Sequence, residues 1–174
     1  MNQIKINQNH LADLLSDETH WESKGLDPTK GILLIGNPGV GKTYAMKEWA
    51  RTKKIGWGHP NLPYEYSDLR DLSTKIVFAK CEQHGPSYLI QFAEDHEMWL
   101  DDIGFEPTEC NSFGTKFIPI QDLLFYRHQL FPRRKTHLTS NYTLDQLGEK
   151  YGPAIISRIK GMCNIVYVEG VDRR

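Results

Sequence analysis

The stretch GILLIGNPGVGKT, residues 31–43, decides the fold of this chain. Its first part, residues 31–35, is a wholly apolar run, which is typical of a strand buried on both faces of a parallel sheet. The remainder matches G-x-x-x-x-G-K-[ST] in full, and Ala45, Met46 and Trp49 then recur at helical spacing. A buried strand, a glycine-rich turn and a helix in this order predict a loop that binds phosphate groups.

The glycine-rich loop, residues 36–43, suits a nucleoside triphosphate with magnesium. Gly39 and Gly41 let the backbone curl so that its N–H groups point at phosphate oxygens, and the helix that follows adds the positive end of its dipole. Lys42 is expected to reach the β- and γ-phosphates, and the Thr43 hydroxyl to bind the metal. The sequence therefore predicts ATP and Mg²⁺ as cofactors. The predicted nucleotide-binding residues of the loop are Gly36, Asn37, Pro38, Gly39, Val40, Gly41, Lys42 and Thr43.

A second informative feature is an apolar run that ends in two acidic residues. Residues 98–100 (MWL) are followed at once by Asp101 and Asp102. Asp101 stands where a carboxylate would hold the magnesium ion, directly or through water, although a capping or solvent-facing aspartate has the same appearance in sequence. Asp102 stands where many such ATPases carry a glutamate that polarises the attacking water. Because its side chain is one methylene shorter, we expect slow hydrolysis.

Two polar residues nearer the C-terminus complete the candidate catalytic set. Asn141 ends the β-rich pentad THLTS (residues 136–140) and is a candidate for orienting water against the γ-phosphate; an asparagine selected for the following turn is the alternative. Arg158 lies in a short helical segment and is a candidate arginine finger for a neighbouring subunit's phosphates; a surface salt bridge is the alternative. The predicted catalytic residues are Asp102, Asn141 and Arg158, and the predicted magnesium ligands are Thr43 and Asp101.

Helical and strand-like segments alternate along the chain. Helices are predicted within residues 69–79, 88–96, 117–130, 144–151 and 154–160, and further strands at residues 64–67, 98–100, 136–140 and 164–169. This alternation predicts an α/β fold of three layers around a mainly parallel five-stranded sheet. Residues 1–25 are expected to be a lead-in or a short helix docked on the core through Leu11, Leu14 and Leu15, and residues 26–174 a single domain.

Composition excludes several classes of protein. With 174 residues, 39% of them hydrophobic and 25% charged, the chain fits a globular protein rather than a disordered or fibrous one. It has no apolar run near the roughly 18–20 residues that cross a bilayer, and its three cysteines are widely spaced, so we expect a cytoplasmic protein without a membrane anchor. The net charge of −1 gives no overall basic field. The cationic run at residues 133–135, beside Phe131, is either a solvated loop or a local contact for nucleic acid.

Together the motifs resemble a known family, the AAA+ domain of DnaC-type replicative helicase loaders and the related IstB-like ATPases of mobile elements. The resemblance covers nearly the whole chain. In chain order it rests on Lys30-Gly31, GNPGVGKT at residues 36–43, LDDIG at 100–104, Phe113-Gly114, RHQLF at 127–131, THLTSN at 136–141, YGPAIISRI at 151–159 and GVDRR at 170–174. This succession is far more specific than a phosphate-binding loop alone.

The resemblance implies a P-loop NTPase that binds ATP between subunits, contacts single-stranded DNA and helps to place a hexameric helicase on it. It implies Walker A roles for Lys42 and Thr43, Walker B roles for Asp101 and Asp102, a sensor 1 role for Asn141 and an arginine-finger role for Arg158. The expected partners are single-stranded DNA, a replicative helicase or a transposase, and further copies of the chain.

Two further expectations follow from the same resemblance. Arg174 falls at the sensor 2-like arginine near the nucleotide, with Arg173 as the alternative. Relative to the family, we expect the chain to lack the N-terminal helicase-binding domain of the longer loaders and the helical lid of many AAA+ proteins.

Several functions are compatible with these motifs. The preferred one is a minimal ATPase of the helicase-loader type, and a transposition helper of the IstB-like branch shares its chemistry. A P-loop kinase is the alternative from another class, although the arginine-rich lid and acceptor pocket usual in such kinases are not found in the sequence. A nucleotide-dependent scaffold that does not hydrolyse ATP is kept open by Asp102.

Overall fold

The protein is an α/β structure built on a parallel sheet of five strands, as the sequence predicts. The computed structural model describes residues 3–52, 73–94 and 97–173. In spatial order the strands are β1 (Gln3–Asn7), β7 (Cys163–Glu169), β2 (Gly31–Ile35), β6 (Lys135–Ser140) and β3 (Glu97–Leu100). The predicted strand at residues 64–67 lies outside the described residues.

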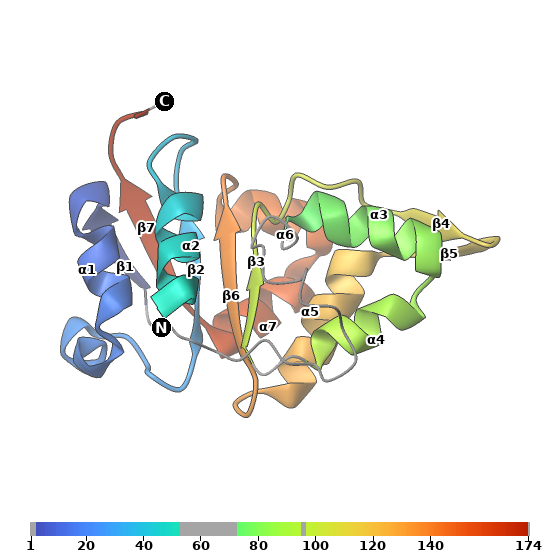
Figure 1. Ribbon diagram of the computed structural model, residues 1–174, viewed down its shortest axis with the longest axis horizontal. Coiled ribbons are helices and arrows are strands. Elements are labelled where there is room, and N and C mark those ends of the chain that lie inside the picture. The colour runs from blue at the N-terminus through green and yellow to red at the C-terminus, as the bar shows by residue number, and fades with distance from the viewer. Residues whose placement is uncertain (1–2, 53–72, 95–96, 174) are drawn as a thin grey trace.

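Helices cover both faces of the sheet and make the predicted three layers (Figure 1). One face carries α1 (Leu11–Ser16) and α2 (Lys42–Thr52). The other carries α3 (Thr74–His84), α4 (Ser87–Ala93), α5 (Pro119–Leu130), α6 (Leu144–Tyr151) and α7 (Pro153–Met162). Strand β2 is buried throughout, with Ile32 and Leu34 in the core beneath α1 and α2, and Leu33 and Ile35 in the opposite core. Burial on both faces explains its unbroken apolar run.

Close approach between β2 and β6 requires a glycine at the start of β2. A Cβ atom on Gly31 would lie 1.8 Å from the backbone oxygen of Thr136, a distance that no side chain could tolerate. The end of α5 is fixed to the same strand by a buried arginine. Arg127 donates from Nε to Thr136 Oγ1 at 2.9 Å and from Nη1 to the backbone oxygen of Ala93 at 2.8 Å. These contacts fix α5 against β6, which lies between β2 and β3 in the sheet.

The N-terminal residues contribute more than a lead-in. Helix α1 docks on the core through buried Leu11, Leu14 and Leu15, as the sequence predicts. Strand β1 is not found by sequence reasoning; it pairs along its whole length with β7 and forms one edge of the sheet. The 3₁₀ turns η1 (Gln8–His10), η2 (Glu18–His20) and η3 (Glu22–Lys24) lie either side of α1.

A small hairpin projects beyond the main sheet at the right of Figure 1. Strands β4 (Cys110–Ser112) and β5 (Thr115–Phe117) pair antiparallel and are also missed by sequence reasoning. The turn between them has positive φ at Phe113 (50°) and Gly114 (81°). The Phe113 side chain is 89% exposed.

Among the described residues, no helix is both long and apolar enough to cross a membrane.

Candidate nucleotide-binding site

The order of the strands brings the predicted site residues to one end of the sheet. Strand β6 lies between β2 and β3, and all three run parallel, so the residues that follow them meet at one edge. The loop between β2 and α2 and the C-terminal tail lie at this end, at the top of Figure 1. They border a cleft of about 430 Å³. Its lining residues are Pro38, Gly39, Gly41, Lys42, Thr43, Tyr44, Asp102, Asn141 and Arg173.

Lys42 lies at the centre of this arrangement and is only 4% exposed. Its ammonium group donates to the backbone oxygens of Gly36 at 2.7 Å and Asn37 at 3.0 Å. It also donates to Asn141 Oδ1 at 2.7 Å. A lysine is therefore held inside the curl of the loop, and its position is tied to Asn141, the residue that follows β6.

Thr43 and Asp101 come together as the predicted magnesium pair. The Thr43 hydroxyl donates to Asp101 Oδ1 at 2.9 Å. A second hydroxyl, that of buried Thr139 on β6, donates to the same oxygen at 2.5 Å. The Thr139 oxygen also accepts the Asp102 backbone N–H at 2.9 Å. Thr139 thus orients both acidic residues, a role that sequence reasoning missed.

Asp102 adopts a backbone conformation that few residues tolerate. Its φ is 59°, in the left-handed region where aspartate and asparagine are better accommodated than longer side chains. Its Oδ1 accepts Asn141 Nδ2 at 3.1 Å, so Asn141 bridges Lys42 and Asp102. Burial and the adjacent Asp101 carboxylate raise the pKa of Asp102 above its ordinary value, and the ammonium groups of Lys42 and Lys75 oppose this shift.

The first turn of α3 fixes the backbone of the two aspartates. The Thr74 N–H donates to the Asp101 backbone oxygen at 3.1 Å, and the Thr74 hydroxyl donates to that of Asp102 at 3.1 Å. Thr74 is fully buried. Sequence reasoning missed it because the contact depends on tertiary structure; for Thr139, a hydroxyl inside an otherwise buried strand was a signal that could have been used.

These residues fit a phosphate chain with a magnesium ion. Gly39 and Gly41 have φ values of 81° and 85°, and the space beside Gly41 is open, since a Cβ there would meet nothing within 4 Å. Helix α2 begins at Lys42, so the N-terminal end of the helix, with its first-turn N–H groups, lies at the cleft. The oxygens of Thr43 and Asp101 are hard ligands of the kind that Mg²⁺ prefers.

The C-terminal segment lies against the glycine-rich loop. The Arg173 N–H donates to the Gly39 backbone oxygen at 3.2 Å, and its guanidinium group donates to Asn9 Oδ1. The Asp172 carboxylate is so close to Gly39 that a Cβ atom there would lie 1.9 Å from Asp172 Oδ1. Of the two arginines considered for this region, Arg173 lines the cleft, whereas Arg174 lies outside the described residues.

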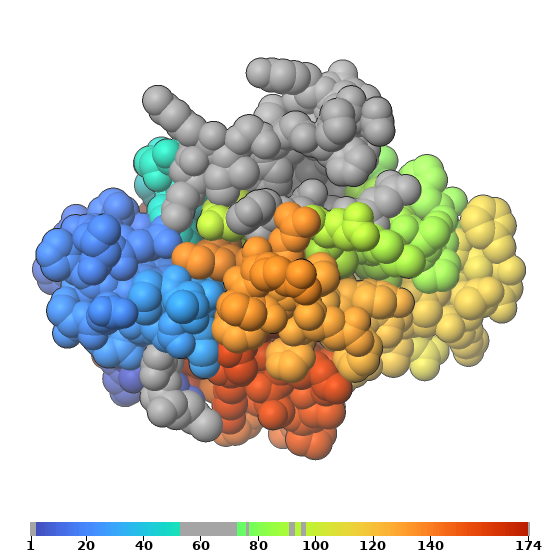
Figure 2. All heavy atoms as spheres, turned by 90° about the horizontal axis from the view of Figure 1, so that it is seen from below, coloured from blue at the N-terminus to red at the C-terminus, as the bar shows by residue number. Residues whose placement is uncertain are grey.

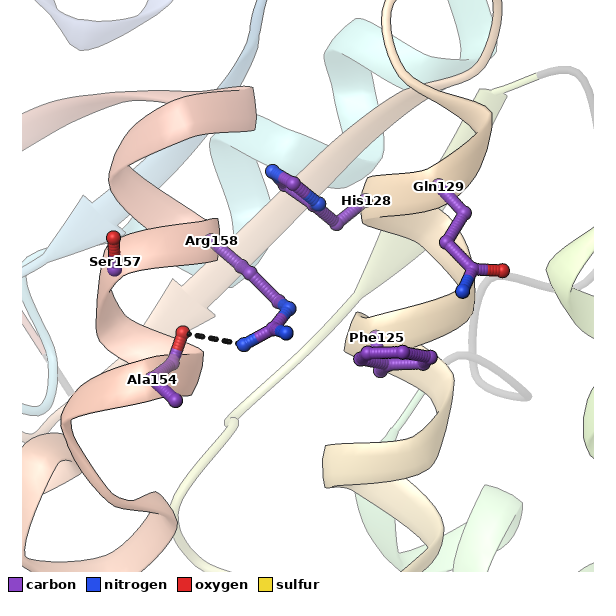
Figure 3. Close-up of a pocket in the computed structure, with 6 residues that line it drawn as sticks. All are labelled: Phe125, His128, Gln129, Ala154, Ser157 and Arg158. Atoms are coloured by element: carbon purple, nitrogen blue, oxygen red, sulfur yellow. Dashed lines mark hydrogen bonds between the residues drawn. The ribbon is translucent and has the colours of Figure 1, made fainter.

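Arg158 is not among the residues that line this cleft. It borders a separate depression of about 570 Å³ between α5 and α7, shown in Figure 3. Its guanidinium carbon lies 4.8 Å from the centre of the Phe125 ring, and its Nη1 donates to the Ala154 backbone oxygen at 3.0 Å. Within one chain, therefore, the structure does not bring Arg158 to the other candidate residues.

The cationic run at residues 133–135 also lies away from the cleft. It connects α5 to the start of β6, at the end of the sheet opposite the glycine-rich loop. Figure 2 views the molecule from this end and shows the connection in orange on the near face. Lys135 forms an ion pair with Glu18 at 3.3 Å, whereas Arg133 is exposed.

No protein-family model matches the chain. The assignment of a function therefore depends on the chemistry of the cleft.

Proposed function

We propose that this protein is an ATP-binding P-loop NTPase of the AAA+ type that hydrolyses ATP slowly. The proposal rests on three hydrogen-bonded pairs of residues that lie together at one cleft. These are Lys42 with Asn141, Thr43 with Asp101, and Asn141 with Asp102, each joined by a hydrogen bond of 3.1 Å or less. A glycine-rich motif matched by chance would not be expected to lie beside polar residues that follow two other strands of the sheet.

Binding uses groups that are already in position. The glycine-rich loop and the first turn of α2 offer backbone N–H groups to the phosphate oxygens. Lys42 exchanges its bonds to backbone oxygens for bonds to the β- and γ-phosphates. Thr43 and Asp101 would hold Mg²⁺, and the ion would supply positive charge against the phosphates.

Hydrolysis requires a base and a group that orients water. Asp102 accepts a proton from water as the water oxygen bonds to the γ-phosphorus, and the bond from that phosphorus to the bridging oxygen breaks to leave ADP and phosphate. Asn141 donates to Asp102 and would orient both the base and the water. The short Asp102 side chain, on a backbone in the left-handed region, would keep turnover slow.

Assembly would complete the site. Because Arg158 lies outside the cleft of its own chain, its proposed role as an arginine finger requires a second copy that brings it to the bound phosphates. We propose that ATP controls this assembly on single-stranded DNA in the cytoplasm, as in helicase loaders of the DnaC type, with a replicative helicase as partner. A transposase is the corresponding partner if the chain acts as an IstB-like helper.

The test is ATP hydrolysis by the purified protein with and without single-stranded DNA, at several protein concentrations. The wild type is compared with Lys42→Ala and Arg158→Ala, and with Lys47→Ala as a matched loss of a half-buried α2 cation that does not line the cleft. DNA-stimulated turnover that rises faster than protein concentration, and that both site variants abolish, is expected. Turnover indifferent to DNA, concentration and Arg158 would point to a self-contained enzyme such as a kinase.

A further inference from the structure

The strand order gives the cleft two chemically different ends. On one side of the glycine-rich loop, β6 and β3 deliver Asn141 and Asp102. On the other side, β7 leads to Arg173, whose N–H donates to the Gly39 oxygen at 3.2 Å. The first end has the carboxylates and the proposed magnesium pair, so the terminal phosphate belongs there. The side of the cleft toward Arg173 is then left for the rest of a bound nucleotide.

An exposed aromatic residue borders this cleft. Tyr44 follows the loop directly, lies in the first turn of α2 and is 71% exposed. Its neighbours Ala45 and Met46 are buried in the core beneath α2, whereas the Tyr44 ring is directed away from that core. To the described part of the chain, the Tyr44 side chain makes no hydrogen bond or ring contact. The Tyr44 ring is therefore accessible to a ligand in the cleft.

Arg173 supplies a second planar group at the same cleft. Its backbone is bonded to Gly39, and its guanidinium group donates to Asn9 at the turn after β1. The arginine is therefore held in place from two sides. Flat aromatic and guanidinium groups are the surfaces on which nucleobases stack.

We propose that Tyr44 stacks on the base of the bound nucleotide and that Arg173 marks the nucleoside end of the cleft. This inference rests on the proposed nucleotide-binding function and deepens it, because it assigns recognition of the base to a residue outside the phosphate-binding motif. The ligand class is a nucleoside triphosphate, and inorganic triphosphate lacks the group that Tyr44 recognises. Stacking is tolerant of base identity, so Tyr44 contributes affinity rather than a choice between ATP and GTP.

The test is isothermal titration of the wild type, Tyr44→Ala and Tyr44→Phe with ATP and with inorganic tripolyphosphate, each in Mg²⁺ buffer. Tyr44→Ala should weaken ATP binding by roughly tenfold, the scale of one base–aromatic stack, and should leave tripolyphosphate affinity unchanged. Tyr44→Phe keeps the ring and should bind ATP as the wild type does. Far-ultraviolet circular dichroism would verify that both variants are folded.

Each other result overturns the inference in a distinguishable way. An equal loss of affinity for both ligands would mean that Tyr44 supports the loop and not the base. Unchanged ATP binding by Tyr44→Ala would place the base elsewhere, while the proposed function would stand. A wild type that binds neither ligand would overturn the proposed function together with the inference.

Discussion

Thr139 shows how a single buried hydroxyl organises the acidic side of the cleft. It donates to Asp101 Oδ1 at 2.5 Å and accepts the Asp102 N–H at 2.9 Å. Thr139→Val keeps the shape but removes both bonds, and we expect a loss of about 1–3 kcal/mol in the free energy of unfolding. Mg²⁺-dependent ATP binding should weaken by roughly 10- to 100-fold, because groups that orient metal ligands have effects of this size.

Urea denaturation and ATP titration at several Mg²⁺ concentrations measure the two effects. Thr139→Ser is the matched control because it retains the hydroxyl, and it should bind Mg²⁺ and ATP nearly as the wild type does. A valine variant with wild-type Mg²⁺ dependence would show that Asp101 needs no such support.

Asp102 combines a chemical and a conformational constraint. Asp102→Glu extends the carboxylate by one methylene, and we expect faster ATP turnover because the base then reaches further toward the water. The same change should lower the free energy of unfolding by on the order of 1 kcal/mol, because glutamate tolerates the φ of 59° less well. Steady-state turnover and urea denaturation measure both quantities; unchanged turnover would argue that Asp102 is not the base.

Cys163, at the start of β7, is expected to make the free energy of unfolding decrease at alkaline pH. Burial raises the pKa of its thiol from 9.0 to about 12, so the folded state keeps the proton that the unfolded state loses. The contribution of this thiol to the free energy of unfolding is therefore complete below pH 9.0 and is lost as pH rises toward 12, by on the order of 1 kcal/mol for each pH unit. Urea denaturation at about pH 8 and about pH 10 should show a smaller loss in Cys163→Ala than in the wild type. Equal losses in the two proteins would contradict the assignment.

At the scale of elements, sequence patterns predict the helices and strands whose own periodicity shows which face is buried. Two predicted elements have the observed bounds: residues 31–35 form β2 and residues 144–151 form α6. An unbroken apolar run is typical of a buried strand, and a capped amphipathic stretch is typical of a helix. The strand β1 has only five residues, and its place depends on pairing with β7 more than 150 positions away. The β4–β5 hairpin is shorter still and lies outside the main sheet.

The candidate site divides in the same way. Lys42, Asp101 and Asn141 could be named from sequence because each follows a recognisable strand, and parallel strands end at a common edge. Thr74 and Asp172 could not, because each acts on a segment far away in sequence. Tertiary packing decides which strands become neighbours, and local sequence patterns do not predict it.

The C-terminal segment after β7 places a negative charge beside the glycine-rich loop. It holds the Asp172 carboxylate against Gly39 in the glycine-rich loop. Asp172→Asn removes this negative charge, and we expect tripolyphosphate to bind roughly threefold more tightly, the scale of an exposed charge contact. The gain should shrink in high salt, because exposed charges are screened.

Titration at low and high salt measures the effect, with Glu109→Gln as a control that removes an exposed carboxylate near the hairpin. Equal affinity of Asp172→Asn and the wild type at low salt would show that the segment swings away before phosphate binds.

For the whole molecule, the separation of Arg158 from the cleft means that its proposed arginine-finger role requires two copies of the chain. Each chain has the candidate nucleotide site at one end of its sheet and Arg158 between α5 and α7, where its guanidinium group lies over the Phe125 ring (Figure 3). Contacts of this head-to-tail kind can generate rings or filaments. Two variants that are inactive for different reasons should then complement each other.

We expect an equal mixture of Lys42→Ala and Arg158→Ala to recover roughly a quarter of wild-type turnover. One site in four pairs an intact Lys42 with a neighbour's intact Arg158 if the copies mix at random. Steady-state ATP hydrolysis by the mixture, measured with single-stranded DNA present, gives the value. A mixture of Lys42→Ala with the double variant is the control and should stay inactive, because no intact lysine is present. Full activity of Arg158→Ala alone would assign Arg158 to its contact with Phe125 and remove the need for a second copy.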